Sequence, residues 1–160
     1  MKSKISHIEI NVLDYAAAIR FYDIILPPMG IVRMNCMKGW TAYSDGQTKF
    51  ILCPTQEKYK KDGFHRKRAG LNHLAFYADS KEDVDKFYNE ILTLNGIDAL
   101  YEKKPFGDSE YYAVFVEGPD RLKLEYVYAP NYCNPETWPS NTKDDFDPYK
   151  EMLLSSEDEQ

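Results

Sequence analysis

The order of hydrophobic and polar residues predicts a strand followed by a helix near the N-terminus. Residues 5–12, ISHIEINV, alternate between hydrophobic and polar side chains, which is typical of a strand with one buried face. Hydrophobic residues then recur at helical spacing from Ala18 to Ile25, and Asp14 stands where a helix N-cap is expected. We expect this helix to end before Pro27, because proline interrupts helical hydrogen bonding.

Three shorter strand-like segments follow this helix. They lie around Val32, at residues 40–43 and at KFILC, and SDGQ between the last two is typical of a hairpin turn. The same order returns in the second half of the chain. There, LNHLAFYA predicts a strand, and Asp79 or Ser80 caps a helix that runs to Leu94. The last three strands are predicted near Ala99, at YYAVFV and at LKLEYVY. The pattern βαβββ is therefore expected twice.

An internal repeat supports this division. The chain matches itself at an offset of 66 residues, the spacing between His7 and His73, without a gap. Two unrelated amphipathic helices would rarely share so many identical positions at one offset. The identical pairs are His7 and His73, Phe21 and Phe87, Tyr22 and Tyr88, Ile25 and Ile91, Leu26 and Leu92, Gly30 and Gly96, and Ile31 and Ile97.

The repeat predicts an α+β fold made of two βαβββ modules that form a curved mixed sheet around a central cleft. Residues 5–53 are the first module, residues 54–69 a polar connector, and residues 70–129 the second module. Residues 130–160 form a C-terminal arm that includes one terminal helix in one interpretation. Three roles are open for this arm: packing over the sheet, contacting a second copy in a homodimer, or acting as a lid.

Alternation along the strands predicts which polar side chains face this cleft. A helix covers one face of each sheet, so residues of the opposite parity line the other face. His7 and His73 lie opposite the helix-facing hydrophobic positions of their strands, and Glu125 lies between the helix-facing Leu124 and Tyr126. Two imidazoles and one carboxylate are therefore expected to converge.

Two histidines and one carboxylate form a recognised ligand set for a divalent metal ion. This set suits non-haem Fe(II), and it also suits Zn(II) or Mn(II) with coordination positions left open; Ni(II) is a further candidate. The open positions let a substrate oxygen replace water, and the cation then stabilises an enolate after proton removal. The repeat-equivalence of His7 and His73 favours a shared role over two unrelated surface histidines.

Composition narrows the class of partner. The chain has 43% hydrophobic and 29% charged residues, which is typical of an ordinary globular protein. A net charge of −6 argues against nucleic acid or an anionic membrane as the partner and leaves a small molecule as the expected one. The sequence has no pattern of a signal peptide or a membrane span. Its three cysteines, an odd number without paired spacing, suit reduced thiols better than disulfides, so a cytoplasmic location is expected.

The segments HIEINVLDYAAAIRFYDIIL, GLNHLAFYADSKEDVDKFYNEIL and YYAVFVEGPDRLKLEYVY resemble the vicinal oxygen chelate superfamily. This superfamily includes glyoxalase I, bleomycin and fosfomycin resistance proteins and extradiol dioxygenases. The resemblance covers about residues 5 to 130 and implies a glyoxalase-like fold with a divalent metal in the cleft. By position, it assigns the ligand roles to His7, His73 and Glu125. It implies lyase, isomerase or ring-cleaving dioxygenase chemistry, or else metal-independent binding of the bleomycin-resistance type.

Two departures leave the reaction open. The resemblance to glyoxalase I implies a four-ligand metal site, with a Glu or Gln on the last strand of the first module. In this chain that strand, TKFILCP, offers no Glu or Gln and only Cys53 as a soft donor. Ring cleavage needs an acid–base histidine and a tyrosine near the metal. His65 in the connector is the remaining histidine, and of the adjacent Tyr111 and Tyr112 one is expected to face the cleft. We assign the catalytic roles to His65 and Tyr112.

Overall fold

The computed structural model of the chain describes residues 3–134 and 136–137. Residues Met1–Pro130 form one compact unit, and Asn131–Gln160 form another. The terminal helix expected in the arm lies outside the described residues. In the part that the structure describes, no helix is long and apolar enough to cross a membrane.

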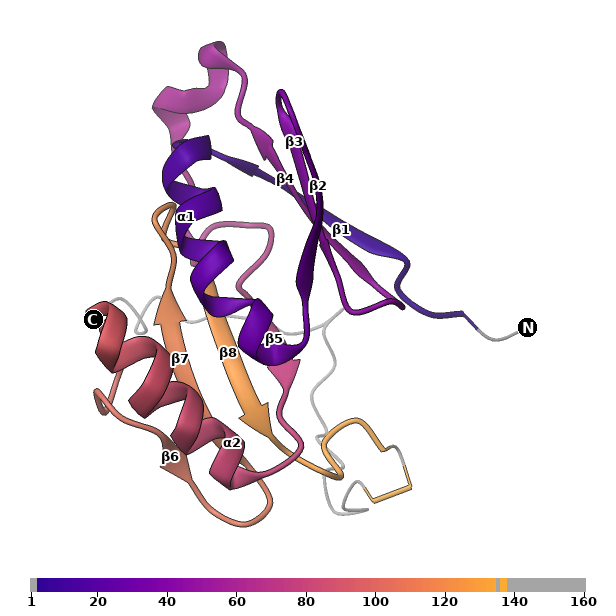
Figure 1. The fold of residues 1–160 in the computed structure, drawn as a ribbon, viewed down its shortest axis with the longest axis vertical. Helices are drawn as coiled ribbons and strands as arrows, with labels where there is room; N and C mark the ends of the chain where they lie inside the picture. Colours follow the sequence, from indigo (N-terminus) through magenta and orange to yellow (C-terminus); the bar gives the residue numbers. More distant parts are fainter. Residues whose placement is uncertain (1–2, 135, 138–160) are drawn as a thin grey trace, which may run out of the picture. The chain divides into compact units, whose positions relative to one another are not determined.

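The first module is a four-stranded mixed sheet with one long helix (Figure 1). The strand order is β1-β4-β3-β2, with β1 parallel to β4 and the other pairs antiparallel. Asp14 caps the helix as expected, since its side chain accepts a hydrogen bond from the Ala17 N–H at 2.9 Å. The elements are β1 (His7–Val12), α1 (Tyr15–Ile25), η1 (Pro27–Met29), β2 (Val32–Met37), β3 (Trp40–Ser44) and β4 (Lys49–Pro54).

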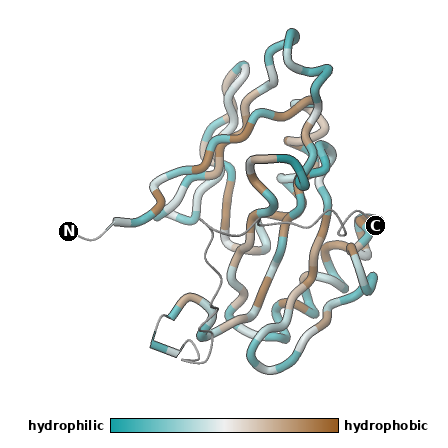
Figure 2. The backbone as a smooth tube through the Cα atoms, turned by 180° about the vertical axis from the view of Figure 1, so that it is seen from behind, coloured by the Kyte–Doolittle hydropathy of each residue, from teal (hydrophilic) through white to brown (hydrophobic). Residues whose placement is uncertain are grey.

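The second module repeats this topology with the strand order β5-β8-β7-β6. Again the first strand is parallel to the last one, and the hairpin pairs are antiparallel. The short turn η2 (Glu57–Asp62) lies in the connector and is drawn mainly in the hydrophilic colour in Figure 2. The elements are β5 (His73–Tyr77), α2 (Lys81–Lys86), η3 (Phe87–Leu92), η4 (Thr93–Asn95), β6 (Phe106–Gly107), β7 (Tyr112–Glu117) and β8 (Lys123–Tyr128). The predicted α+β architecture of two βαβββ modules is thus confirmed, as two four-stranded sheets.

The second helical segment differs from the continuous helix that the sequence predicts. Ser80 caps it and Gly96 ends it in the left-handed conformation, at φ 66°, as the turn signals indicate. Between these ends, α2 widens into the π-type turns of η3 and then tightens into η4. Hydrophobic spacing alone does not separate these hydrogen-bond patterns, because all three place similar residues on the buried face.

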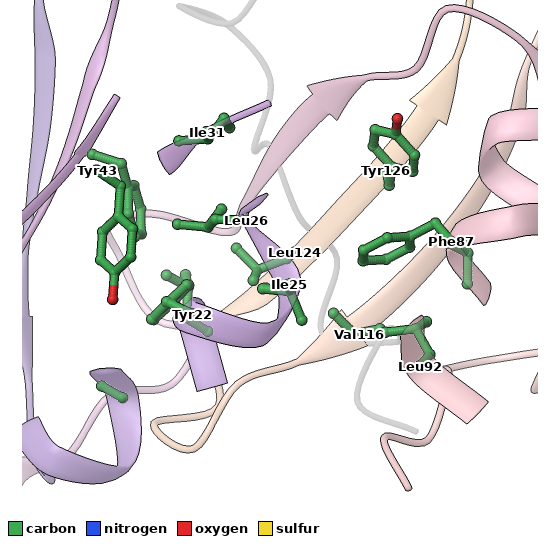
Figure 3. Close-up of a cluster of buried hydrophobic side chains, with 14 of the residues drawn as sticks. Tyr22, Ile25, Leu26, Ile31, Tyr43, Phe87, Leu92, Val116, Leu124 and Tyr126 are labelled. Carbon is green, nitrogen blue, oxygen red and sulfur yellow. The ribbon is translucent and has the colours of Figure 1, made fainter. Parts of the chain in front are cut away.

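One hydrophobic cluster contains residues of both modules, and Figure 3 shows part of it. Leu124 of β8 lies beside Ile25 of α1 and the C-cap residue Leu26, and all three are nearly inaccessible to solvent. At Gly118 the backbone runs close to Phe21 and leaves little room for a side chain. Burial of these side chains is the main stabilising contribution, at about 1.5–3 kcal/mol for each large aliphatic residue. The helix-facing parity expected for Leu124 and Tyr126 is therefore confirmed.

Candidate functional site

The two strands β5 and β8 bring the chemistry of the second module together. They run parallel in a register that pairs His73 with Lys123 and Ala75 with Glu125. Their odd-numbered side chains lie opposite the helix-facing ones, as the alternation predicts. Phe115 of β7 pairs with Glu125 and lies on this same face. We call the face of the second sheet that carries His73, Phe115, Lys123 and Glu125 the site face.

Glu125 is the buried centre of the site face. Its side chain is 2% exposed, and a buried carboxylate is stable only when it is hydrogen-bonded or paired. The His73 Nε2 atom lies 3.1 Å from one carboxylate oxygen, and the Tyr111 hydroxyl donates to the other. His73 and Glu125, two of the three predicted metal ligands, therefore meet in one chain.

The surroundings of His73 fix which ring nitrogen is available. Its Nδ1 atom lies 2.8 Å from the carboxamide oxygen of Asn72, which can only accept a hydrogen bond, so Nδ1 carries a proton. The other nitrogen, Nε2, then faces the oxygen of Glu125. With a metal ion, the same Nε2 lone pair and carboxylate oxygen are two donors directed at one point, oriented by an outer hydrogen bond.

The turn that ends β6 positions Tyr111. Asp108 accepts hydrogen bonds from the backbone N–H groups of Glu110 and Tyr111, at 2.8 and 3.2 Å. Gly107 has φ 119°, and a side chain there would collide with the Tyr111 carbonyl oxygen. This tight turn therefore requires glycine and sets the direction in which Tyr111 reaches Glu125.

Tyr112, one of the two predicted catalytic residues, lies on the opposite face of β7. Its hydroxyl donates to Asp85 of α2 at 2.7 Å. Burial, together with this hydrogen bond and the charge of Asp85, raises the pKa of Tyr112 to about 12. The structure thus brings Tyr111, and not Tyr112, to Glu125. The prediction named Tyr112, because the sequence does not show where β7 begins and therefore which of the two neighbours faces the cleft.

The connector holds His65, the other predicted catalytic residue, within a local turn. Its Nδ1 accepts a hydrogen bond from the Lys67 N–H at 3.2 Å, and its carbonyl oxygen accepts one from Arg68. The neighbouring Arg66 pairs with Glu117 at the end of β7. His65 therefore does not join the His73–Glu125 pair through any of its hydrogen bonds.

His7, the third predicted ligand, occupies the equivalent strand in the first module. It is exposed, and its Nδ1 lies 3.3 Å from the hydroxyl of the adjacent Ser6. Within residues 3–134 and 136–137, no group of three or more His, Cys, Asp or Glu side chains is arranged to hold a metal ion. One chain therefore supplies the His73–Glu125 pair without His7.

The last strand of the first module carries Cys53 on the same face as Glu9. The Cys53 thiol donates to a Glu9 carboxylate oxygen at 3.3 Å. Burial first, and then this hydrogen bond and the charge of Glu9, raise the pKa of Cys53 to about 11. A thiol with a raised pKa is a poor metal donor, since metal ions bind the thiolate.

An apolar groove of about 450 Å³ lies elsewhere, between the first module and β5. Ile8, Phe50 and Phe76 contribute to its walls, and none of the three predicted metal ligands lines it. The groove therefore does not add to the His73–Glu125 pair.

Sequence reasoning missed the aromatic residues around the pair. Tyr101, Phe106 and Phe115 form a ring cluster, with centroids 5.3 to 6.4 Å apart, and Phe115 also lies 6.3 Å from the His73 ring. Phe115 and Ala113 have the same strand parity and pack on the same side of β7. Strand alternation would therefore have placed Phe115 on the site face. No pattern in the sequence places the loop residue Tyr101.

Comparison with known proteins identifies a family. Residues 4–126 match the model of the Glyoxalase/Bleomycin resistance protein/Dioxygenase superfamily. An uncharacterized Bacillus subtilis protein, YqjT, is 37% identical over 123 residues, which is 76% of this chain and 95% of that protein.

Solved structures agree with this match. A candidate glyoxalase from Bacillus halodurans is 37% identical, with a TM-score of 0.71 over 78% of this chain and 94% of that one. Lactoylglutathione lyase from Agrobacterium tumefaciens has a TM-score of 0.59 at 21% identity, over 79% of this chain and 94% of that one. At this lower identity, the second likeness concerns the fold alone.

Proposed function

Because the chain belongs to the glyoxalase/bleomycin resistance protein/dioxygenase superfamily, we propose that it binds a divalent metal ion and a small oxygenated molecule at the site face. The proposed ligands are His7, His73 and Glu125, and the proposed metals are Fe, Mn, Zn or Ni. Members of the superfamily include enzymes, among them the lyase compared above. We assign this chain to lyase, isomerase or dioxygenase chemistry, with the proton-transfer reactions favoured.

The geometry of His73 carries the proposal. Asn72 holds the proton on Nδ1, and Nε2 faces a buried carboxylate oxygen 3.1 Å away. A neutral imidazole nitrogen and a carboxylate directed at one point fit the donor preferences of these cations. When bound, such an ion acts as a Lewis acid on substrate oxygens and stabilises negative charge on them.

His7 would complete the set from a second copy of the chain. In one chain it stays apart from the His73–Glu125 pair, yet it holds the repeat-equivalent position on an exposed strand face. A two-fold axis that places β1 of one copy against the site face of the other would supply His7 twice, once for each site. The proposed homodimer is therefore part of the metal site.

Tyr111 is the side chain placed for proton transfer. Its hydroxyl reaches Glu125, so a ligand that approaches the carboxylate also approaches this hydroxyl. His65, which ring cleavage would require as an acid–base group, has its Nδ1 engaged by the backbone of Lys67. This contrast supports proton-transfer chemistry of the lyase or isomerase type over oxygenation.

Metal titration of chelator-treated protein tests the proposal. Isothermal titration calorimetry with Mn(II), Zn(II), Ni(II) and, under anaerobic conditions, Fe(II) is expected to show saturable binding to the wild type. H73A and E125Q are expected to lose at least about tenfold in affinity, because each removes a direct donor. H65A serves as the matched histidine control and should bind as the wild type does. Equal binding by wild type, H73A and E125Q would refute the metal site.

Metal-independent binding of the bleomycin-resistance type is the second candidate. It is favoured by the full pairing of Glu125, because His73 and Tyr111 satisfy both carboxylate oxygens without a cation. In that case, bleomycin should bind chelator-treated protein, and H73A should leave its affinity unchanged. Absence of bleomycin binding to wild-type protein in calorimetry would remove this candidate.

A further inference from the structure

Lys123 is a buried cation that the metal proposal does not use. Its side chain is 9% exposed, at the start of β8 on the site face. Its ammonium donates to the Tyr101 hydroxyl at 3.2 Å and lies 5.1 Å from the centre of the Phe115 ring. None of the ion pairs among the described residues involves it. A buried charge is costly unless it is paired, and a hydroxyl and ring faces offset only part of that cost.

The surroundings of Lys123 adjoin the His73–Glu125 pair. In the β5–β8 register, Lys123 is the direct partner of His73, and Glu125 follows two residues later on the same face, about 7 Å away along the strand. Phe115 touches both groups, since its ring lies beside His73 as well as below the Lys123 ammonium. Lys123 and Glu125 are therefore neighbouring charged side chains on the same strand face.

A strained loop residue provides the hydroxyl. Tyr101 has φ 61°, in the left-handed region that costs a bulky residue about 1–2 kcal/mol. The loop is tied down by the Tyr88 hydroxyl, which donates to the Lys103 carbonyl oxygen at 2.9 Å. Strain of this kind persists where the surrounding structure enforces it, often at a ligand site. Here the strained conformation of Tyr101 places its hydroxyl within hydrogen-bond distance of the Lys123 ammonium.

We propose that Lys123 and Tyr101 bind the carboxylate of a small oxygenated acid, whose neighbouring oxygen reaches the His73–Glu125 pair. This inference rests on the proposed function, and it specifies the substrate class as an anionic one, such as a 2-oxo acid. A carboxylate fits better than a phosphate because this part of the site face offers one cation and one hydroxyl, with the ammonium over aromatic rings. Phosphate dianions usually need several cations or a helix N-terminus.

The test uses benzoylformate, a 2-oxo acid with an aromatic ring, and its uncharged methyl ester. Calorimetric titrations are run on full-length, chelator-treated protein and repeated with Zn(II) present. K123M is expected to weaken benzoylformate binding about ten- to a hundredfold, the usual loss for a charge-assisted hydrogen bond. Ester binding should be unaffected. K38M removes the same charge at an exposed lysine and should leave both affinities unchanged.

Further variants and ligands keep the outcome decisive. Y101F retains the ring and should lose a few-fold in benzoylformate affinity. Inorganic phosphate competing better than benzoylformate would overturn the carboxylate assignment. Equal affinities for K123M and K38M, or no benzoylformate binding to the wild type, would overturn the inference. A benzoylformate affinity that Zn(II) does not change would instead count against the metal site alone, because the dependence of the affinity on Lys123 is measured without metal.

Discussion

At the scale of single residues, parity along a strand determined most of the candidate site. It placed His73 and Glu125 on one face because strand side chains alternate, and the structure brings these two together. Tyr112 was predicted, whereas the structure brings Tyr111 to Glu125, since that choice depends on a turn at Gly107 whose geometry the sequence does not reveal. Lys123 has the same parity as Glu125, but its hydroxyl partner Tyr101 comes from a loop, which parity does not place.

The hydroxyl of Tyr111 is expected to contribute to stability through Glu125. The variant Y111F should lower the free energy of unfolding by about 1–3 kcal/mol, because it leaves one oxygen of a buried carboxylate without its donor. Y112F is the matched control and should cost about 1 kcal/mol or less, since Asp85 lies nearer solvent. Urea unfolding followed by circular dichroism measures both. A larger loss in Y112F than in Y111F would contradict this ranking.

Cys53 is expected to react slowly with alkylating reagents. A thiol with a pKa of about 11 is roughly one part in a thousand thiolate at pH 8. In a background where Cys36 and Cys133 are serine, E9Q should speed iodoacetamide labelling roughly three- to tenfold, because it removes a carboxylate that disfavours the thiolate.

Mass spectrometry of the labelled protein gives this rate. E57Q, at an exposed glutamate in the connector, is the control and should leave it unchanged. A Cys53 that reacts as fast as an exposed thiol, or an E9Q variant no faster than its parent, would show that Glu9 does not set its reactivity.

At the scale of elements, local signals gave the start of both helices. Asp14 and Ser80 accept hydrogen bonds from backbone N–H groups in the first turn, as their positions indicated. The division of the second helical segment into α2, η3 and η4 was not predicted. Phe87 and Leu92 of η3 are buried in the hydrophobic cluster, and the same hydrophobic spacing also suits a continuous α-helix.

The Asp14 cap allows a clean test of helix capping. D14A should lower the free energy of unfolding by about 1 kcal/mol, because the Ala17 N–H loses its acceptor. D14N keeps a capping oxygen and should cost only a few tenths of that value. Thermal or urea unfolding of the two variants side by side provides the comparison. Equal losses in D14A and D14N would indicate that charge, and not the cap, is responsible.

At the scale of the whole molecule, the repeat predicted two modules, but it did not show how their sites are completed. Identical positions show that two units share a fold, whereas the placement of His7 relative to His73 depends on how modules and copies pack. Within residues 3–130, Asp120 of the second module accepts a hydrogen bond from the Leu13 N–H of the first at 2.7 Å. The turn between β7 and β8 therefore helps to hold the modules together.

Asp120 should make stability depend on pH. Burial raises its pKa in the folded chain, so the folded state binds this proton more tightly than the unfolded state does. Its contribution is full below the unfolded value, about 4, and is lost as the pH rises through the folded value. Relative to D120N, which cannot titrate, the wild type should lose stability with rising pH across that window.

Urea unfolding at a series of pH values measures this difference. D98N, at an exposed aspartate, is the matched control and should not change the slope of the wild-type curve. A wild type that gains stability relative to D120N as the pH rises would reverse the sign and contradict the assignment.

The most direct test of the proposed metal site, shared between two copies, mixes two variants that each lack one of its ligands. H7A and H73A are each expected to bind no Zn(II) at this site. After subunit exchange, a hybrid dimer regains one intact site, with His7 from one copy and His73 and Glu125 from the other. Random exchange of equal amounts should restore about one Zn(II) per four chains, measured by elemental analysis after gel filtration. No recovery in verified hybrid dimers, or full binding by H7A alone, would contradict the account.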